Sequence, residues 1–261
     1  MNRRDFLKVI AAAGIGGTVV FEGLDNFGAK AAEMNKSSKV LQVKHLGMVI
    51  DVSKFQTKED YQRVAVACHS YHNVPNIDNV NQEVKWIWKD DFEHTFAELE
   101  SRYLSEEIKT KEFPVLCNHC ESPACVRVCP TQATFKRDDG IVSMDYHRCI
   151  GCRFCMAACP FGARSFNFSD PRPYLDQVNP EIPTRTKGVV EKCTFCVERL
   201  DKGLQPLCVE ASRGGIIFGD LEDPNSEVRK ILQENFAIRR KVELGTGPSI
   251  YYIFGGGGVG A

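Results

Sequence analysis

The chain has 261 residues and a formal net charge of −1, and hydrophobic residues make up 43% of it. This length suits one large domain or two small ones. A nucleic-acid-binding domain normally presents a basic face or stripe, which this nearly neutral composition does not favour. We therefore expect a globular chain after the N-terminal segment, with no nucleic acid among its partners.

Residues 1–31 have the pattern of an export signal. A twin-arginine pair, Arg3 and Arg4, precedes a short apolar run over residues 9–20, and Ala29-Lys30-Ala31 fits an A-x-A cleavage site. The run is shorter than the roughly 20 residues that span a bilayer. The pattern predicts export by the twin-arginine route to the periplasmic side. An ordinary N-terminal helix is the alternative, and an uncleaved signal would serve as an anchor at the membrane surface.

Short apolar segments alternate with polar ones in the next part of the chain. Residues 47–52 predict a strand, and so do residues 84–88, where apolar and charged residues alternate. Between these segments, Cys68 precedes a polar turn at residues 72–76. Acidic residues, with apolar side chains at helical spacing, predict an amphipathic helix over residues 91–110.

The later elements are also short. Residues 133–136 and 141–144 flank Asp138-Asp139-Gly140, which predicts a hairpin with a glycine turn. Residues 163–168 predict the matching strand after the second cysteine run. The other expected elements are a Pro-rich loop after residue 170, a helix at 226–235, a strand at 249–254 and a flexible tail at 255–261.

Twelve cysteines divide into three sets of four. A first run has the pattern C-x2-C-x4-C-x3-C-P and consists of Cys117, Cys120, Cys125 and Cys129. A second run has the bacterial ferredoxin pattern C-x2-C-x2-C-x3-C-P and consists of Cys149, Cys152, Cys155 and Cys159. The remaining cysteines are Cys68, Cys193, Cys196 and Cys208. Because a [4Fe–4S] cluster takes four thiolates, the chain is predicted to carry electrons through three such clusters.

The ligand sets follow from the rule for two-cluster ferredoxins, in which the fourth cysteine of each run binds the partner cluster. Set 1 is predicted to be Cys117, Cys120, Cys125 and Cys159. Set 2 is predicted to be Cys129, Cys149, Cys152 and Cys155. Set 3 is predicted to be Cys68, Cys193, Cys196 and Cys208. Four thiolates per cluster leave no iron open for bond chemistry, so we expect no catalytic residue and no enzyme activity from this chain alone.

Two other uses of cysteine fit this pattern less well. Zinc also binds C-x2-C pairs, but three cysteines packed so closely and followed by C-P are not its pattern. Disulfides suit an exported chain, yet neighbouring cysteines in the second run would compete for strained pairings. A zinc-stabilised structural module therefore stays as the hypothesis of a different class, and a colourless, zinc-containing preparation would favour it.

From Gly47 to about Pro224 the sequence resembles the four-cluster ferredoxin subunits of the dimethyl-sulfoxide-reductase and polysulfide-reductase superfamily. Cys193-Thr194-Phe195-Cys196 and Cys208 fit the last cysteine run of that family, C-x2-C-x11-C-x3-C. Met48 to Asp51 and the Asn73-Val74-Pro75 turn fit the segments around its first run. We predict an α+β fold of loop-rich, tandem bacterial-ferredoxin-like cluster-binding modules with short hairpins and helices.

The departures from the family concern one cluster. Lys54-Phe55-Gln56 stands where the family's first run holds cysteines, and Ser212 stands where its last run ends in one. In the family these positions share a single cluster, so the resemblance implies that this cluster is lost as a unit and three remain. We expect Phe55 to fill the vacated space as a buried side chain beside Ser212.

The resemblance also divides the chain. Residues 1–31 are the signal segment, and residues 32–111 are a degenerate first ferredoxin-like half with an insertion and one remaining ligand. Residues 112–170 form the two-cluster module, residues 171–224 complete the first half with the last cysteine run, and residues 225–261 are a C-terminal helix and tail.

Within the superfamily the chain most resembles the exported iron–sulfur subunit of the membrane complex linked to dissimilatory sulfite reduction, the DsrO type. Residues 149–160, 191–199 and 245–252 carry this likeness. The iron–sulfur subunit of cytochrome-c-linked menaquinone reductase is a related interpretation. Both imply an extracytoplasmic electron-transfer subunit that docks on a polytopic quinone-reactive membrane subunit, near a multihaem cytochrome c and further iron–sulfur and membrane subunits. The alternative is an electron relay for an exported molybdopterin oxidoreductase.

Overall fold

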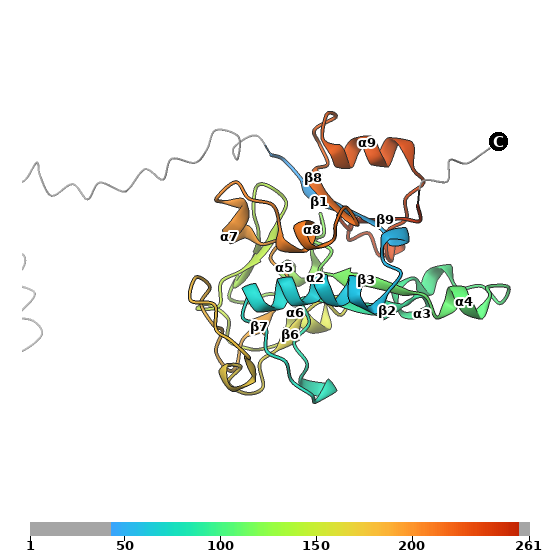
Figure 1. The fold of residues 1–261 in the computed structure, drawn as a ribbon. Helices are drawn as coiled ribbons and strands as arrows, with labels where there is room; N and C mark the ends of the chain where they lie inside the picture. Colours follow the sequence, from blue (N-terminus) through green and yellow to red (C-terminus); the bar gives the residue numbers. More distant parts are fainter. Residues whose placement is uncertain (1–42, 256–261) are drawn as a thin grey trace, which may run out of the picture. The chain divides into compact units, whose positions relative to one another are not determined.

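The computed structural model describes residues 43–255, so the predicted signal segment and nearly all of the predicted flexible tail lie outside the described residues. The fold is α+β and loop-rich, as predicted, with short helices around several small sheets (Figure 1). The strands are β1 (Leu46–Asp51), β2 (Ile87–Asp91), β3 (Glu112–Leu116), β4 (Thr134–Lys136), β5 (Val142–Met144), β6 (Ser165–Phe166), β7 (Val190–Glu191), β8 (Ile216–Asp220) and β9 (Ile250–Ile253). The α-helices are α2 (Lys58–Tyr71), α3 (Phe92–Thr95), α4 (Glu106–Lys109), α5 (Ala124–Arg127), α6 (Phe154–Ala157), α7 (Val197–Leu200), α8 (Leu207–Ala211) and α9 (Glu227–Glu234). Short 3-10 helices cover Val52–Lys54, Val80–Gln82, Ala97–Leu99, Arg172–Tyr174 and Val242–Leu244.

A three-stranded sheet joins distant parts of the chain. Its order is β8-β1-β9, with β1 antiparallel to β8 and parallel to β9. Met48 in the middle of β1 lies opposite Phe218 of β8 and Ile250 of β9. Both faces of β1 are buried, which explains its continuous apolar sequence. The predicted strands at 47–52 and 249–254 are confirmed as β1 and β9.

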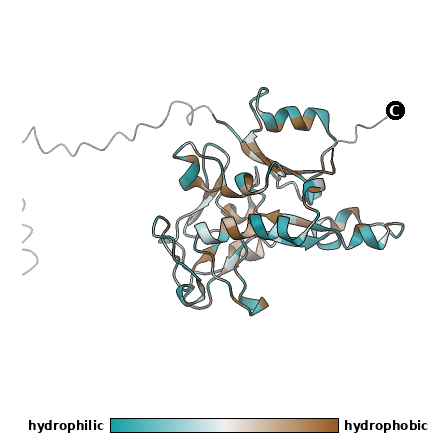
Figure 2. Cartoon of the chain, in the orientation of Figure 1, coloured by the Kyte–Doolittle hydropathy of each residue, from teal (hydrophilic) through white to brown (hydrophobic). Residues whose placement is uncertain are grey.

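Helix α9 covers one face of this sheet (Figure 1). Ser226 begins the helix by accepting a hydrogen bond from the Arg229 amide, and Val228 packs in a small core with Val49 and Leu221. Figure 2 colours the strands below α9 as largely hydrophobic, whereas the helix also carries hydrophilic residues. The predicted helix at 226–235 is confirmed.

Helix α2 carries Cys68 in its last turns and packs against α8, which carries Cys208. The helix begins at a reciprocal capping box. The Thr57 hydroxyl accepts from the Asp60 amide, and the Asp60 carboxylate accepts from the Thr57 amide. Sequence analysis predicted no helix here, although the Thr57-x-x-Asp60 spacing is the signal that marks its start.

The prediction of a long amphipathic helix over residues 91–110 is wrong. The segment instead forms α3, a 3-10 turn and α4, because the backbone of Phe96 leaves the helical region at φ −130° and ψ 48°. The Phe96 ring turns inward and meets Phe113 and Tyr252 edge-on, with ring centroids 5.2 Å apart in both pairs. Leu99 and Tyr103, which the helical spacing placed on the same apolar face, are exposed.

The cysteine-rich region contains the predicted hairpin. Strands β4 and β5 pair antiparallel, and Gly140 in their turn has a φ of 86°, where glycine is favoured. Within residues 163–168, only β6 is a strand, and it pairs with β7 rather than with the hairpin. The strand predicted at 84–88 begins later, at Ile87, and pairs as β2 with β3.

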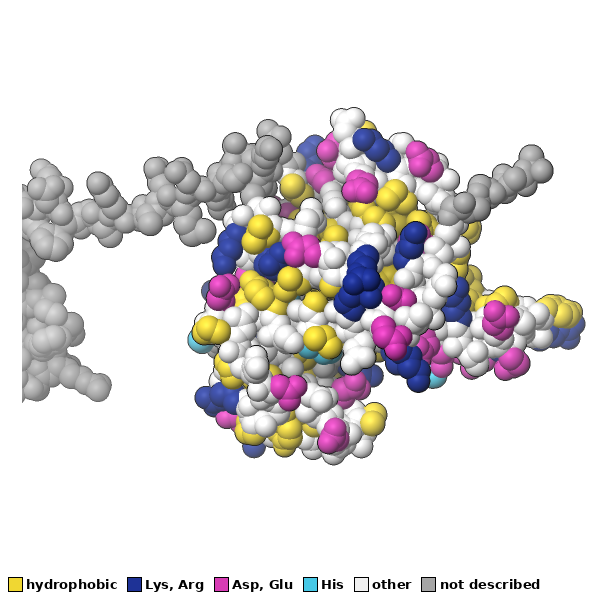
Figure 3. Space-filling model, in the orientation of Figure 1, with side chains coloured by type: hydrophobic (Ala, Val, Ile, Leu, Met, Phe, Trp, Pro, Cys, Tyr) yellow, Lys and Arg dark blue, Asp and Glu magenta, His cyan; other side chains and the backbone are white. Residues whose placement is uncertain are grey.

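Among residues 43–255, no helix is both long and apolar enough to cross a bilayer. On the face drawn in Figure 3, acidic and basic side chains are interspersed, and hydrophobic side chains lie between them singly and in small groups. The described residues belong to one compact unit, and the boundaries predicted within it stay predictions.

Candidate iron–sulfur sites

Set 3 takes its cysteines from helices α2 and α8 and from the loop between β7 and α7. Cys68, Cys193, Cys196 and Cys208 are all buried. Burial raises the pKa of Cys68 well above its usual value, and repulsion from the other three thiolates adds to the rise. Such repulsion acts over short distances. The structure therefore brings these four cysteines together, although they lie far apart in the sequence.

The loop of set 3 has a strained backbone that aims an amide at a sulfur. Phe195 and Cys196 both have left-handed conformations, with φ of 57° and 53°. In this conformation the Phe195 N–H donates to the Cys193 Sγ at 3.5 Å. Strained residues of this kind persist where the surroundings demand them, and they are frequent at functional sites.

Set 1 takes Cys117 and Cys120 from the loop between β3 and α5, Cys125 from α5, and Cys159 from just after the end of α6. Burial raises the pKa of Cys120 to about 12, and repulsion from Cys117, Cys125 and Cys159 contributes to the rise. Burial also raises the pKa of Cys159, with Cys117 and Cys125 among the further causes. The fourth cysteine of the second run thus lies with the first three of the first run.

The four cysteines of set 2 line one small cavity; they are Cys129, Cys149, Cys152 and Cys155. Gly151 allows the loop to close, because its φ is 69° and a Cβ there would clash with the Gly188 carbonyl oxygen. Burial raises the pKa of Cys129, but hydrogen bonds from the Thr134 backbone and from Thr131 outweigh it, so that the net pKa is lowered. This environment favours a thiolate at Cys129.

The three sets lie in series. Burial raises the pKa of Cys155 in set 2, and Cys125 of set 1 is among the groups that raise it further. Burial likewise raises the pKa of Cys193 in set 3, and Cys117 of set 1 is the next largest cause. Set 1 is therefore the neighbour of both other sets.

Basic side chains lie at these junctions. Arg164 lies close to Cys125 and Cys155, and Lys192 lies close to Cys117 and Cys193. Lys192 is fully buried, and its Nζ donates to the carbonyl oxygens of Val142 and Cys193, the latter at 2.7 Å. His119 is also buried; its Nδ1 accepts from the Val142 amide at 3.1 Å, and its ring stacks on Phe195. The sequence pattern made His119 and Lys192 weak candidates for tuning a cluster, with a surface position as the alternative, and it did not single out Arg164.

The residues present fit anionic iron–sulfur clusters. Thiols whose pKa is raised by burial stay neutral until a metal displaces their protons, and sulfur ligands in groups of four are what such clusters take. The buried charged residues of the described chain are also unbalanced: Arg164, Arg185, Lys192 and Arg240 are basic, and Glu191 alone is acidic. Buried charges need partners, so this excess of positive charge fits negatively charged groups at the cysteines. When bound, each cluster would supply one-electron transfer, while the chain holds it and excludes water.

The position at which the sequence predicts the loss of one cluster is filled by protein. Ser212 ends α8, and its hydroxyl donates to the Val209 carbonyl at 2.7 Å and accepts from the Ile216 amide at 2.8 Å. Phe55 is only 3% exposed. The Phe55 ring is so close to Gly215 that a Cβ at this glycine would lie 2.8 Å from the ring. The Gly215 amide in turn donates a hydrogen bond to the Ser212 carbonyl. Phe55 is therefore buried in the neighbourhood of Ser212.

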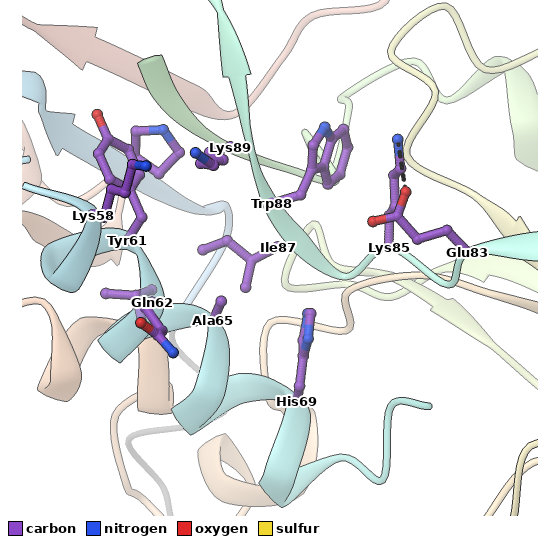
Figure 4. A pocket seen from close by; sticks show the side chains of 12 residues that line it. Lys58, Tyr61, Gln62, Ala65, His69, Glu83, Lys85, Ile87, Trp88 and Lys89 are labelled. Atoms are coloured by element: carbon purple, nitrogen blue, oxygen red, sulfur yellow. Dashed lines mark ion pairs between the residues drawn. The ribbon is translucent and has the colours of Figure 1, made fainter. Parts of the chain in front are cut away.

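A groove of about 560 Å³ lies between α2 and β2 and is lined by none of the cysteines (Figure 4). Tyr61 and His69 approach it from α2, and Trp88 from β2. Glu83 and Lys85 at its edge form an ion pair of 3.4 Å. The groove supplies no ligand to the three sets.

Comparison with known proteins gives the family. Residues 108–171 match the 4Fe-4S dicluster domain family. The chain is 40% identical to Hdr-like menaquinol oxidoreductase iron-sulfur subunit 1 of Archaeoglobus fulgidus, over 98% of this chain and 99% of the relative. It is 37% identical to the menaquinone reductase iron-sulfur cluster-binding subunit of Nitratidesulfovibrio vulgaris, over 79% and 88%. It is 35% identical to the arsenate respiratory reductase iron-sulfur subunit ArrB of a Shewanella species, over 80% and 95%. The chain therefore belongs to the family of [4Fe–4S] electron-transfer subunits of oxidoreductase complexes, and it is not the catalytic subunit of one.

Removing Cys68 tests set 3. Cys68→Ala deletes one of four thiolates, so we expect iron to fall from about twelve to about eight atoms per chain while sets 1 and 2 keep their clusters. Iron analysis and EPR spectroscopy of anaerobically prepared protein measure both outcomes. Ser70→Ala, at an exposed position on the same helix, is the control and should retain all the iron. Unchanged iron and EPR signals in Cys68→Ala would contradict the assignment.

Truncating Phe55 tests the filled site. Phe55→Ala leaves a cavity in a packed core, and we expect it to destabilise the protein by about 3–5 kcal/mol. Anaerobic denaturant unfolding measures the change. Phe236→Ala is the matched control, because that phenylalanine is 79% exposed and should cost much less. Equal losses in both variants would show that Phe55 does not fill a closed space.

Proposed function

We propose that this member of the iron–sulfur subunit family works outside the cytoplasm. In this proposal it relays electrons between a multihaem cytochrome c and a polytopic quinone-reactive membrane subunit, through three [4Fe–4S] clusters. The relatives that are named as menaquinol oxidoreductase and menaquinone reductase subunits support the quinone link. In this proposal the chain serves sulfur metabolism and anaerobic respiration, as the sequence resemblance to the subunit linked to sulfite reduction implies.

The observation that carries the proposal is the serial arrangement of the three cysteine sets. Set 1 is the neighbour of sets 2 and 3, so an electron that arrives at one end of the series has a path to the other. A series of metal centres with no open coordination position suits transfer between partners rather than bond chemistry.

Set 2 offers a contact with a partner. Cys152 is exposed, Ile150 on the same loop is 67% exposed, and Phe154 at the start of α6 is 60% exposed. Large apolar side chains at the surface, grouped beside a redox centre, suit a protein interface. We therefore assign electron exchange with one partner subunit to the loop around Cys152.

An electron relay for an exported molybdopterin oxidoreductase is the second candidate. The likeness to the iron-sulfur subunit of arsenate respiratory reductase favours it. The two candidates differ in their partners, so a large molybdopterin subunit in the purified complex would support the second and contradict the first.

The stoichiometry of the native complex tests the proposal. The intact complex, extracted from membranes under anaerobic conditions, should contain about twelve irons per copy of this chain, a haem-containing subunit and a polytopic membrane subunit. Ser212→Cys should leave the iron unchanged, because the other ligands of a fourth cluster are absent. Mass and metal analysis provide both readings, and about sixteen irons in the unmodified complex would contradict the count of three clusters.

Changing the paired arginines tests the location. Replacing Arg3 and Arg4 with lysine should keep the chain in the cytoplasm, since the arginine pair is the address of the twin-arginine route. Cell fractionation followed by immunodetection measures the distribution, and an unrelated twin-arginine protein serves as the control. Normal export of the double variant would contradict the signal assignment.

A further inference from the structure

The buried basic residues of this chain differ in how their charge is balanced. Arg185 forms a buried ion pair with Glu191, with Nε 2.8 Å from Oε2. Glu191 is the one buried carboxylate among residues 43–255, and Trp86 and Asn167 also donate to it. The positive charge of Arg185 is therefore matched within the protein.

Arg164 has no such partner among the described residues. It is 5% exposed, and its guanidinium donates to the Thr134 hydroxyl at 2.7 Å and to the Met144 sulfur at 3.3 Å. Both acceptors are neutral, and Arg164 forms no ion pair with a carboxylate in this part of the chain. Arginine cannot lose its proton in a protein, so its charge stays in place.

The groups that face Arg164 are cysteines of two different sets. Thr134 and Met144, the two acceptors of Arg164, line the same small cavity as Cys155 and the other cysteines of set 2. Cys125 of set 1 and Cys155 of set 2 are the charged groups that act most strongly on the guanidinium. Burial lowers the pKa of Arg164, but the nearby thiolates raise it by more. A buried charge is stable only when it is paired, so the counter-charge has to come from what these cysteines hold.

We propose that Arg164 is a shared counter-charge of the clusters in sets 1 and 2, and that it raises the reduction potentials of both. The inference deepens the proposed function and depends on its ligand sets. One-electron reduction of a cluster adds one negative charge, which comes from the electron that a partner subunit supplies. A fixed positive charge stabilises the reduced state more than the oxidised state, particularly where water is excluded.

The test is a redox titration of the native complex, followed by EPR. Arg164→Met removes the charge and keeps a long side chain. It should lower the reduction equilibrium constants of clusters 1 and 2 by about tenfold, which is about 59 mV for a one-electron couple, and leave cluster 3 unchanged. Arg164→Lys keeps the charge and should restore most of the shift.

Arg148→Met is the matched control, because it also removes one positive charge near set 2, but from an exposed position. Arg148 precedes Cys149 of set 2, but its side chain is 64% exposed and pairs with Asp145 at 3.2 Å. Water and the carboxylate screen its charge, so the potential of cluster 2 should move much less than in Arg164→Met.

Unchanged potentials in Arg164→Met, or equal shifts in Arg164→Met and Arg164→Lys, would overturn the proposal and leave Arg164 with a packing role. If Arg164→Met loses iron from sets 1 and 2 while Arg164→Lys keeps it, the counter-charge is supported; loss in both would overturn it. Iron analysis of the unmodified complex tests the number of clusters separately, so failure of the proposed function is recognised before the variants are compared.

Discussion

The burial of groups of thiols is the constraint on which the rest of this structure depends. Burial, and after it repulsion between neighbouring thiolates, disfavours the charged forms of the sulfurs, as the raised pKa values of Cys68, Cys120 and Cys193 show. Metal binding removes the protons and joins the sulfurs through iron, so folding and cluster assembly are coupled. The excess of buried basic residues belongs to the same balance, because its positive charge has no carboxylate partners and suits an anionic group.

A scaffold has to bring the separated members of set 3 together, and the three-stranded sheet does so. Strand β1 leads into α2 and therefore positions Cys68, while β8 follows α8 and positions Cys208. Pairing of β1 with β8 closes the long loop between these helices, and β9 adds a third strand on the other side of β1. The entropy of closing a loop grows only slowly with its length, so the intervening two-cluster region is accommodated at little extra cost.

The sequence predicted the parts of the site that depend on local spacing. The two dense cysteine runs, the hairpin between them and the α9 and β9 segments follow from short patterns of residues. The sequence did not predict α2 as a helix, and it predicted a helix over residues 91–110 that Phe96 interrupts in order to pack on Phe113 and Tyr252. Arg164 was missed for a related reason: a basic residue near a cysteine run is ordinary in sequence, and only the fold buries it beside thiols from different sets.

On the proposed assignment, the filled position near Ser212 marks where the series of clusters ends. Ser212 satisfies its hydrogen bonds with the backbone, and Phe55 packs against Gly215 where the family has further ligands. On the proposed assignment, set 3 is then the last centre at this end of the chain rather than an internal one. Its four cysteines are buried, whereas set 2 reaches the surface at Cys152. The two ends therefore place different demands on their partners. The partner at set 2 can approach the redox centre at an apolar surface. The partner at set 3 has to bring its own redox centre close to the surface of α2 and α8, the helices that carry Cys68 and Cys208.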